Sequence, residues 1–224
     1  MKHEHIDRRP GDSAAPARPT GVPTQRRARF RADNSTPPTP SARMAAIGIV
    51  QDGAPILNAV AREFDLPREA DAARRLLDRL AVVADRATGL HVFAKGMGIA
   101  APQVGVGRRA ALVRTATGRT LTLVNPTVAE ESEDLDEQYE GCLSFFDVRG
   151  MVVRPVTIVV RHQDLAGRPL VTTFAEADAR LVGHEIDHLD GRLYRGRMAP
   201  DALLVPVAQY RGTGQRWTFR TARP

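Results

Sequence analysis

Cysteine is nearly absent from this chain of 224 residues, which contains only Cys142. A single cysteine excludes an intramolecular disulfide, and a free thiol survives best in a reducing compartment, so we expect a cytoplasmic protein. Long hydrophobic runs are also lacking. None approaches the roughly 18 residues of a membrane-spanning helix, and no apolar stretch near the N-terminus resembles a secretory signal. We therefore expect no membrane partner.

Acidic residues are scarce at the N-terminus, which explains most of the net charge of +6. Residues 1–43 contain nine Lys/Arg and four Asp/Glu, a charge of +5, and the remainder of the chain carries +1. This distribution does not imply a general basic surface for binding phosphates, so we expect no specific nucleic-acid partner. Residues 1–43 are rich in Pro and Arg and poor in large apolar residues, which predicts a disordered tail. A contact with RNA or the ribosome is the functional alternative for it.

Residues 44–224 are expected to form a single domain that is weakly structured from about residue 211. Apolar residues at helical spacing predict a packing helix over 68–86, between Pro67 and Gly89, and a second helix over 175–189 that stops at Gly191. Between them the pattern predicts strands at 110–115, 120–125, 152–162 and 169–174, with an acidic loop at 130–137. The fold class is therefore α+β, with antiparallel strands packed around the later helix.

Two histidines on that later helix carry the strongest sign of chemistry. His184 and His188 lie at i and i+4 and project from one face, so both imidazoles can reach a single metal ion. Glu185 lies beside the same face, where it can move protons for a water activated by the metal. A surface helix with two solvated histidines is the alternative, but apolar neighbours such as Leu181 and Ile186 favour burial.

Cys142 could supply a third protein ligand. Two imidazoles and a thiolate leave a fourth position open, which is the pattern of a catalytic rather than a structural metal site. A lone cysteine is more often an inert buried residue. The neighbouring Gly141 favours the functional interpretation, because glycine lets the backbone approach a metal or a substrate closely.

A glycine-rich segment, residues 96–103, is the third feature. Gly96, Gly98 and Ala101 fit the spacing of a dinucleotide-binding fingerprint. We reject that interpretation, because Pro102 would interrupt the helix that the fingerprint must open. We expect instead a close-packed turn that lines a pocket, with Gln103 supplying an amide donor. A flexible surface loop is the alternative.

In chain order, the segments at 96–103, 140–144 and 184–188 resemble the three signature motifs of the peptide deformylases. In that family the motifs read G-x-G-x-A-A-x-Q, E-G-C-L-S and H-E-x-D-H, and every defined position matches here. The resemblance extends from about residue 47 to residue 193. It implies a metal-dependent hydrolase of linear amides that removes the formyl group from N-formylmethionyl nascent peptides during protein biosynthesis. The products would be formate and a free amino terminus.

The resemblance also implies roles for individual residues. The metal ligands would be Cys142, His184 and His188, with one ion per chain. Fe²⁺ is the family's usual metal, whereas the ligand set suits Zn²⁺ equally well and could hold another divalent ion. Glu185 would act first as general base and then as general acid.

Five further positions take expected roles from the resemblance. The side-chain amide of Gln103 and the backbone N–H of Leu143 would stabilise the oxyanion. Gly98, Gly141 and Arg149 would contact the substrate.

Three alternatives stay open beside this interpretation. Phe145-Phe146 replaces the Val-Pro that often follows the cysteine motif, which could adapt the site to another formylated substrate. A His-Glu-x-x-His metallopeptidase would need a third ligand downstream, but no histidine follows His188 and no glutamate follows Glu185. A binding protein that has lost activity would show damage at Glu185, at Gln103 or at a ligand, and none is seen.

Overall fold

A computed structural model describes residues 37–219 of the chain. In this part of the chain the α-helices are α1 (Pro40–Ala46), α2 (Ala70–Leu90) and α3 (Glu176–Leu189). The strands are β1 (Gly96–Ala100), β2 (Ala110–Thr115), β3 (Thr120–Glu131), β4 (Leu135–Glu140), β5 (Val148–Pro155), β6 (Thr157–Gln163), β7 (Pro169–Ala175) and β8 (Val205–Pro206). Short 3-10 helices lie at Pro55–Asn58, Ala101–Val104, Leu143–Phe145 and Tyr194–Arg197.

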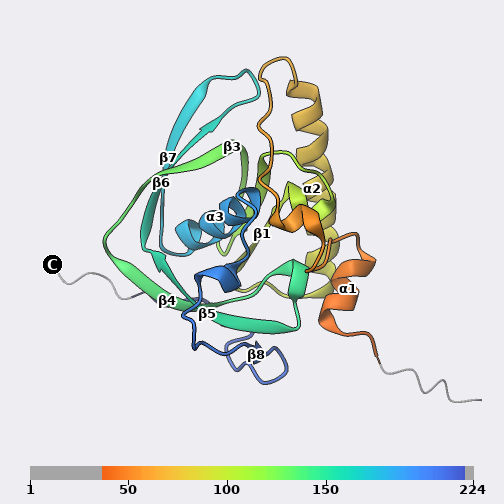
Figure 1. Ribbon diagram of the computed structural model, residues 1–224, viewed down its shortest axis with the longest axis vertical. Coiled ribbons are helices and arrows are strands. Elements are labelled where there is room, and N and C mark those ends of the chain that lie inside the picture. Colours follow the sequence, from red (N-terminus) through yellow and green to blue (C-terminus); the bar gives the residue numbers. More distant parts are fainter. Residues whose placement is uncertain (1–36, 220–224) are drawn as a thin grey trace, which may run out of the picture. The chain divides into compact units, whose positions relative to one another are not determined.

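The strands form two antiparallel sheets around α3 (Figure 1). The larger sheet has the order β1-β2-β3-β6-β7, and the smaller one has the order β4-β5-β8. Helix α3 contacts every strand of the larger sheet. The predicted mixed α+β class with antiparallel strands is thus confirmed.

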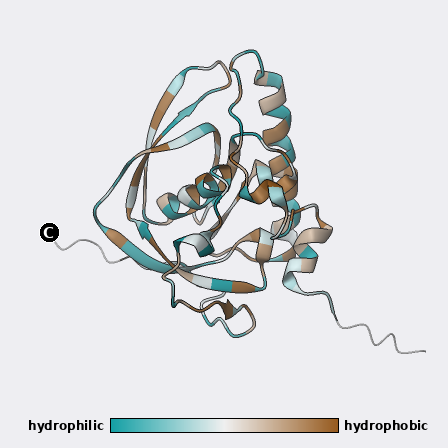
Figure 2. Ribbon diagram, in the orientation of Figure 1, coloured by the Kyte–Doolittle hydropathy of each residue, from teal (hydrophilic) through white to brown (hydrophobic). Residues whose placement is uncertain are grey.

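Helix α2 buries one stripe of small and branched residues against β1 and β2. Its buried residues are Ala73, Leu76, Leu80, Val83, Ala84 and Ala87, and hydrophobic and hydrophilic positions alternate along it (Figure 2). The stripe packs on Ile99 of β1 and Leu112 of β2 in one core cluster. Each fully buried leucine contributes roughly 1.5–3 kcal/mol of transfer free energy, so this contact fixes β1 firmly.

The predicted helix over 68–86 is real but begins and ends later, since α2 continues to Leu90 with Gly89 inside its last turn. Gly89 does not adopt a left-handed conformation, so it does not end the helix. Strand β2 matches its prediction, and β3 continues six residues beyond the predicted end at 125.

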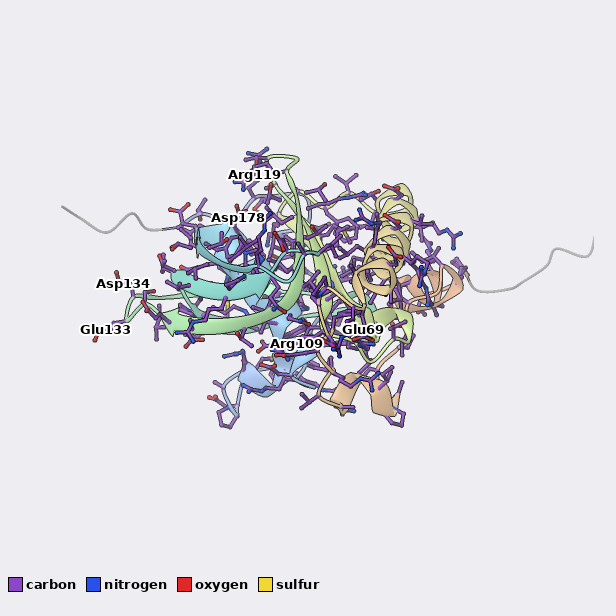
Figure 3. The ribbon with its side chains drawn as sticks, turned by 90° about the horizontal axis from the view of Figure 1, so that it is seen from above. Glu69, Arg109, Arg119, Glu133, Asp134 and Asp178 are labelled. Carbon is purple, nitrogen blue, oxygen red and sulfur yellow. The ribbon has the colours of Figure 1, made fainter. Side chains whose placement is uncertain are left out.

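The prediction of an acidic loop over 130–137 is mostly wrong. Only 132–134 connect β3 to β4, and Glu133 and Asp134 project at the tip of that connection (Figure 3). The other acidic residues lie within strands. Alternate residues of a strand face opposite sides, so a strand at the molecular surface can carry charges on its outer face without becoming a loop.

The single strand predicted over 152–162 is two strands in different sheets. Strand β5 ends at Pro155 and pairs with β4, whereas β6 begins at Thr157 and pairs with β3 and β7. Pro155 has no N–H to continue a ladder, and the chain bends at Val156. The β-branched pattern alone does not reveal that the sheet changes there.

The predicted boundary between tail and domain at residues 43 and 44 falls inside α1, which buries Met44. The rest of the predicted tail, residues 1–36, lies outside the described residues. At the other end, residues 211–219 contain turns but no helix or strand. Within residues 37–219 no helix is long and apolar enough to cross a membrane.

Candidate metal centre

The small residues of β1 allow α3 to approach it closely. A Cβ added at Gly96 would lie 2.8 Å from Leu181, and a Cβ added at Gly98 would lie 2.5 Å from the carboxyl carbon of Glu185. Ala100 packs with Leu189. Every second residue of a strand and every fourth residue of a helix advance by similar distances, about 6–7 Å, so the two elements remain in register. The predicted turn over 96–103 is therefore wrong: it is β1 followed by a 3-10 helix.

Cys142, His184 and His188 come together in the interior from two elements. Cys142 lies just after β4, and both histidines lie on α3. Their ligand atoms lie within 4.8 Å of one another, and Cys142 Sγ is 3.2 Å from His188 Nε2. Burial lowers the pKa of His188 well below its usual value, helped by nearby His184 and Arg154. A neutral imidazole is the form that binds a metal.

Glu140 orients the first histidine. Its Oε2 lies 2.9 Å from His184 Nδ1, and a histidine that donates Nδ1–H to a carboxylate presents the lone pair of Nε2 to a metal. Burial raises the pKa of Glu140, but the ion pair with Arg154 and the hydrogen bond from His184 outweigh this and hold it well below its usual range. The sequence motif includes Glu140, but the spacing gave no sign of this supporting role.

Arginines hold the two buried carboxylates beside the site. Arg154 donates to Glu140 at 2.6 and 3.0 Å and to Asp187 at 2.9 Å. Arg180 donates to Glu140 at 2.7 Å, and Arg197 donates to both carboxylate oxygens of Asp187 at 2.6 Å. Each of these buried carboxylates therefore has arginine partners, which avoids the cost of an unpaired buried charge. Arg180 lies four residues before His184, a spacing that could have revealed it.

Glu185 lies on the neighbouring stripe of α3, against Gly98. It is 2% exposed, and its Oε2 has no hydrogen-bond partner among the described residues. Burial, together with the nearby charges of Glu140 and Asp187, raises the pKa of Glu185 to about 7 despite opposing charges on His184 and Arg154. A carboxyl group with such a pKa can both accept and donate a proton near neutral pH.

Gln103 and Leu143 lie beside the cluster. The Gln103 Oε1 accepts from the Ala100 backbone N–H at 2.9 Å, which fixes the amide. Its Nε2 then points to the Cys142 Sγ at 3.5 Å and the Ser144 Oγ at 3.2 Å. Leu143 is buried, and together with Gln103, His184 and Glu185 it lines one pocket of the protein. The amide donor that the sequence predicted therefore faces the thiol.

Gly141 makes room for Arg149. A Cβ added at Gly141 would lie 2.6 Å from the guanidinium carbon of Arg149. Arg149 donates to the backbone carbonyls of Phe146 and Val148 at 2.9 and 2.8 Å and lies over the Phe146 ring. Gly98, Gly141 and Arg149, the predicted substrate contacts, all line one pocket with His184 and Glu185.

The two phenylalanines after the cysteine motif point to different places. Phe146 lines the pocket and makes edge contacts with His91 and Phe93. Phe145 stacks on Tyr194, with ring centres 4.8 Å apart. Only Phe146 can therefore change the shape of the pocket directly.

The C-terminal segment supplies a pocket wall that sequence reasoning missed. Tyr210 and Trp217 line the pocket, and the Trp217 ring N–H donates to the Tyr139 carbonyl at 3.3 Å. Lys95, directly before β1, donates to the Tyr210 hydroxyl at 2.6 Å. The segment lacks helix or strand periodicity, so no sequence pattern could have predicted its position.

Proteins similar to this chain cover the part that carries these residues. A family model described as polypeptide deformylase matches residues 47–202. Peptide deformylase 1 of Streptomyces coelicolor is 36% identical over 189 residues, which are 78% of this chain and 82% of that protein. Peptide deformylase 2 of Gloeobacter violaceus is 39% identical over 127 residues, 55% of this chain and 68% of that protein.

Solved structures resemble the fold as well. A class I type b peptide deformylase from Acinetobacter baumannii with Met-Ala-Ser bound is 30% identical, with a TM-score of 0.58, and the match covers 67% of this chain and 96% of that one. Peptide deformylase 1B of Arabidopsis thaliana, in a mutant form, is 29% identical with a TM-score of 0.58, over 68% of this chain and 80% of that one.

Proposed function

Because the chain belongs to the peptide deformylase family, which removes the N-formyl group from newly made peptides, we propose that it performs this hydrolysis with the side chains around Cys142, His184 and His188. The enzyme class follows from the family. The assignment of roles to residues is our proposal, and one observation carries it: a buried carboxyl group, Glu185, lies beside three clustered metal-binding side chains.

Cys142, His184 and His188 would hold one metal ion per chain. The fit is good, since a thiol and two imidazoles converge within 4.8 Å and Glu140 orients one imidazole. Three protein ligands leave one position open for substrate or water. When bound, such a metal polarises a carbonyl group and lowers the pKa of water from 15.7 toward about 7. We propose Fe²⁺ in the natural enzyme, although the ligands suit Zn²⁺ as well.

Glu185 would carry the proton. Its Oε2 accepts a proton from the water that attacks the formyl carbon, and the C–N bond of the formamide then breaks. The same oxygen returns the proton to the departing amine, so the products are formate and a free amino terminus. The lack of any hydrogen-bond partner for Oε2 among the described residues supports this role, because nothing competes for that proton.

Two donors would stabilise the charge that develops on the formyl oxygen. They are the Nε2 amide of Gln103, fixed by its bond to the Ala100 N–H, and the backbone N–H of Leu143. A donor of this kind contributes about 3 kcal/mol to the transition state. Gly98 and Gly141 would let the substrate lie close to the backbone, and Arg149 would bind its peptide group.

Cys142 as third ligand argues against a His-Glu-x-x-His metallopeptidase, because that class takes its third ligand from beyond the helix. We propose formylated nascent peptides as substrates. We also propose a cytoplasmic location, because a free thiolate ligand survives best in a reducing compartment. A transient ribosome contact through residues 1–43 is a further part of the proposal.

A formate-release assay tests the function. Protein purified without oxygen, with its metal content measured, would be given formyl-Met-Ala-Ser and acetyl-Met-Ala-Ser. We expect one metal ion per chain, formate from the first peptide and no acetate from the second, because a site built for the smallest acyl group excludes a methyl. Absence of formate release from metal-loaded protein would contradict the proposed function.

A further inference from the structure

Two cationic side chains in the pocket have no carboxylate partner. Within residues 37–219, neither Lys95 nor Arg149 has a carboxylate oxygen within 4.0 Å. Arg149 is 7% exposed and donates to backbone carbonyls. Lys95 is partly buried and donates to the Tyr210 hydroxyl. Cations withdrawn from water without a counter-charge are costly, and they are rare unless a ligand supplies the charge.

Lys95 is held in place by aromatic groups rather than by acids. Its Nζ lies 5.1 Å from the ring centre of Tyr210 and 5.3 Å from that of Trp217. Lys95 is the only lysine of the chain besides Lys2. Aromatic faces and a hydroxyl fix the ammonium at the pocket wall and leave its full charge available to a ligand.

The two acidic groups that line the pocket, Glu140 and Glu185, do not pair with Lys95 or Arg149. Glu140 is bonded to Arg154, Arg180 and His184, and Glu185 lies buried against β1. Burial, followed by the charges of Arg149 and Arg180, lowers the pKa of Lys95 to about 8. The pocket wall therefore carries excess positive charge, which an anion would neutralise.

We infer that the pocket selects formylated substrates that carry a carboxylate, with Lys95 as the residue that recognises this group. The inference rests on the proposed function and specifies its substrate class. The carboxylate could be an acidic side chain or the free C-terminus of a short peptide, since both present the same group to the ammonium. Residues 210–217 would then serve as a substrate-selecting wall rather than as an inert end of the domain.

The test compares kcat/KM for four peptides. Formyl-Met-Glu-Ser amide is compared with formyl-Met-Gln-Ser amide, and formyl-Met-Ala-Ser with its C-terminal amide. We expect the wild-type enzyme to prefer the acid of at least one pair by about tenfold, the scale of a hydrogen bond to a charged group. The pair that shows the preference identifies the source of the carboxylate.

Variants separate recognition from a structural role. In Lys95→Met the acid-to-neutral ratio should fall to about one. Arg68→Met, which removes the same charge from a side chain that is 82% exposed, should retain the wild-type ratio. A purely structural Lys95 that anchors residues 210–217 would lower both rates together and leave the ratio unchanged, which would overturn the inference.

A wild-type measurement remains decisive if the Lys95 variant does not fold. For the pair that shows the preference, the acidic product should inhibit cleavage of a neutral substrate more strongly than the neutral product. The products compared are Met-Glu-Ser amide with Met-Gln-Ser amide, or Met-Ala-Ser with its C-terminal amide. Equal rates in both pairs would overturn the inference and leave the proposed function intact. No formate from any peptide would overturn both.

Discussion

Replacing Gly98 by alanine places a methyl group in the space that Glu185 occupies. The new Cβ would lie 2.5 Å from the carboxyl carbon and 2.6 Å from the Cγ of Glu185, whereas real Cβ contacts essentially never fall below 3.0 Å. The carboxyl group must therefore move by 0.5 Å or more. Helix α3 cannot move away from β1 without losing the contacts on either side of Glu185, because Leu181 packs against Gly96 and Leu189 packs with Ala100 of the same strand.

A displacement on the order of 1 Å of a catalytic group costs about 100-fold in rate. We therefore expect Gly98→Ala to lower kcat/KM for formyl-Met-Ala-Ser by about 100-fold. Metal content should remain at one ion per chain, because the substitution touches no ligand. Formate release, elemental analysis and thermal unfolding of the same preparation separate these effects.

Gly89→Ala is the matched control, since a Cβ there meets nothing within 4 Å. It should retain wild-type activity and gain slight stability, because alanine is favoured over glycine within a helix. A Gly98→Ala enzyme with wild-type kcat/KM would refute the reasoning that Glu185 acts from its position against β1.

The remaining predictions concern the metal, the buried ion pairs, the tail and pH. Cys142→Ala should lose most of its metal by elemental analysis, and full metal content would exclude the thiol as a ligand. Arg154→Met removes one partner from each of two buried carboxylates, Glu140 and Asp187. It should lower the free energy of unfolding by about 3–5 kcal/mol, which corresponds to a fall in Tm on the order of 10 °C in thermal unfolding. An unchanged Tm would contradict this expectation. Deleting residues 1–36 should leave kcat/KM for a short formyl peptide unchanged, and a large loss would show that the tail takes part in catalysis. The pKa of Lys95 is about 8, so most of its positive charge is lost as pH rises from about 7 to 9. The ratio of kcat/KM for the acidic substrate to that for the neutral one should therefore fall over that range. A constant ratio would contradict the role of Lys95 in recognising a carboxylate.

Local sequence patterns predicted the elements whose own residues carry the signal for a helix or a strand. The apolar stripe of α2 is confirmed, because it buries one face of the helix and shows the matching period. The strand Ala110–Thr115 is also confirmed, as a short run of mostly apolar residues that is buried on both faces. The change of sheet at Val156 was missed, because pairing partners lie far away in sequence and leave no local period. Gly96 and Gly98 suggested a turn, but they are small because a helix crosses their strand.

The site was predictable where one element or one motif carries it. His184 and His188 share a helix face, so their convergence follows from spacing alone. The contact of Glu140 with His184 joins β4 to α3, and that of Lys95 with Tyr210 joins positions 115 residues apart. Such contacts depend on the whole fold, and no local physical rule predicts them from sequence.

The central claim is that Cys142, His184 and His188 hold the metal while Glu185 moves the proton. The Glu185→Gln variant tests it most directly, through formate released from formyl-Met-Ala-Ser per bound metal ion. The amide keeps the size of the side chain but cannot accept the proton, so we predict full metal content and formate release lowered by about 10³-fold. Formate release at the wild-type rate per bound metal ion would contradict the account.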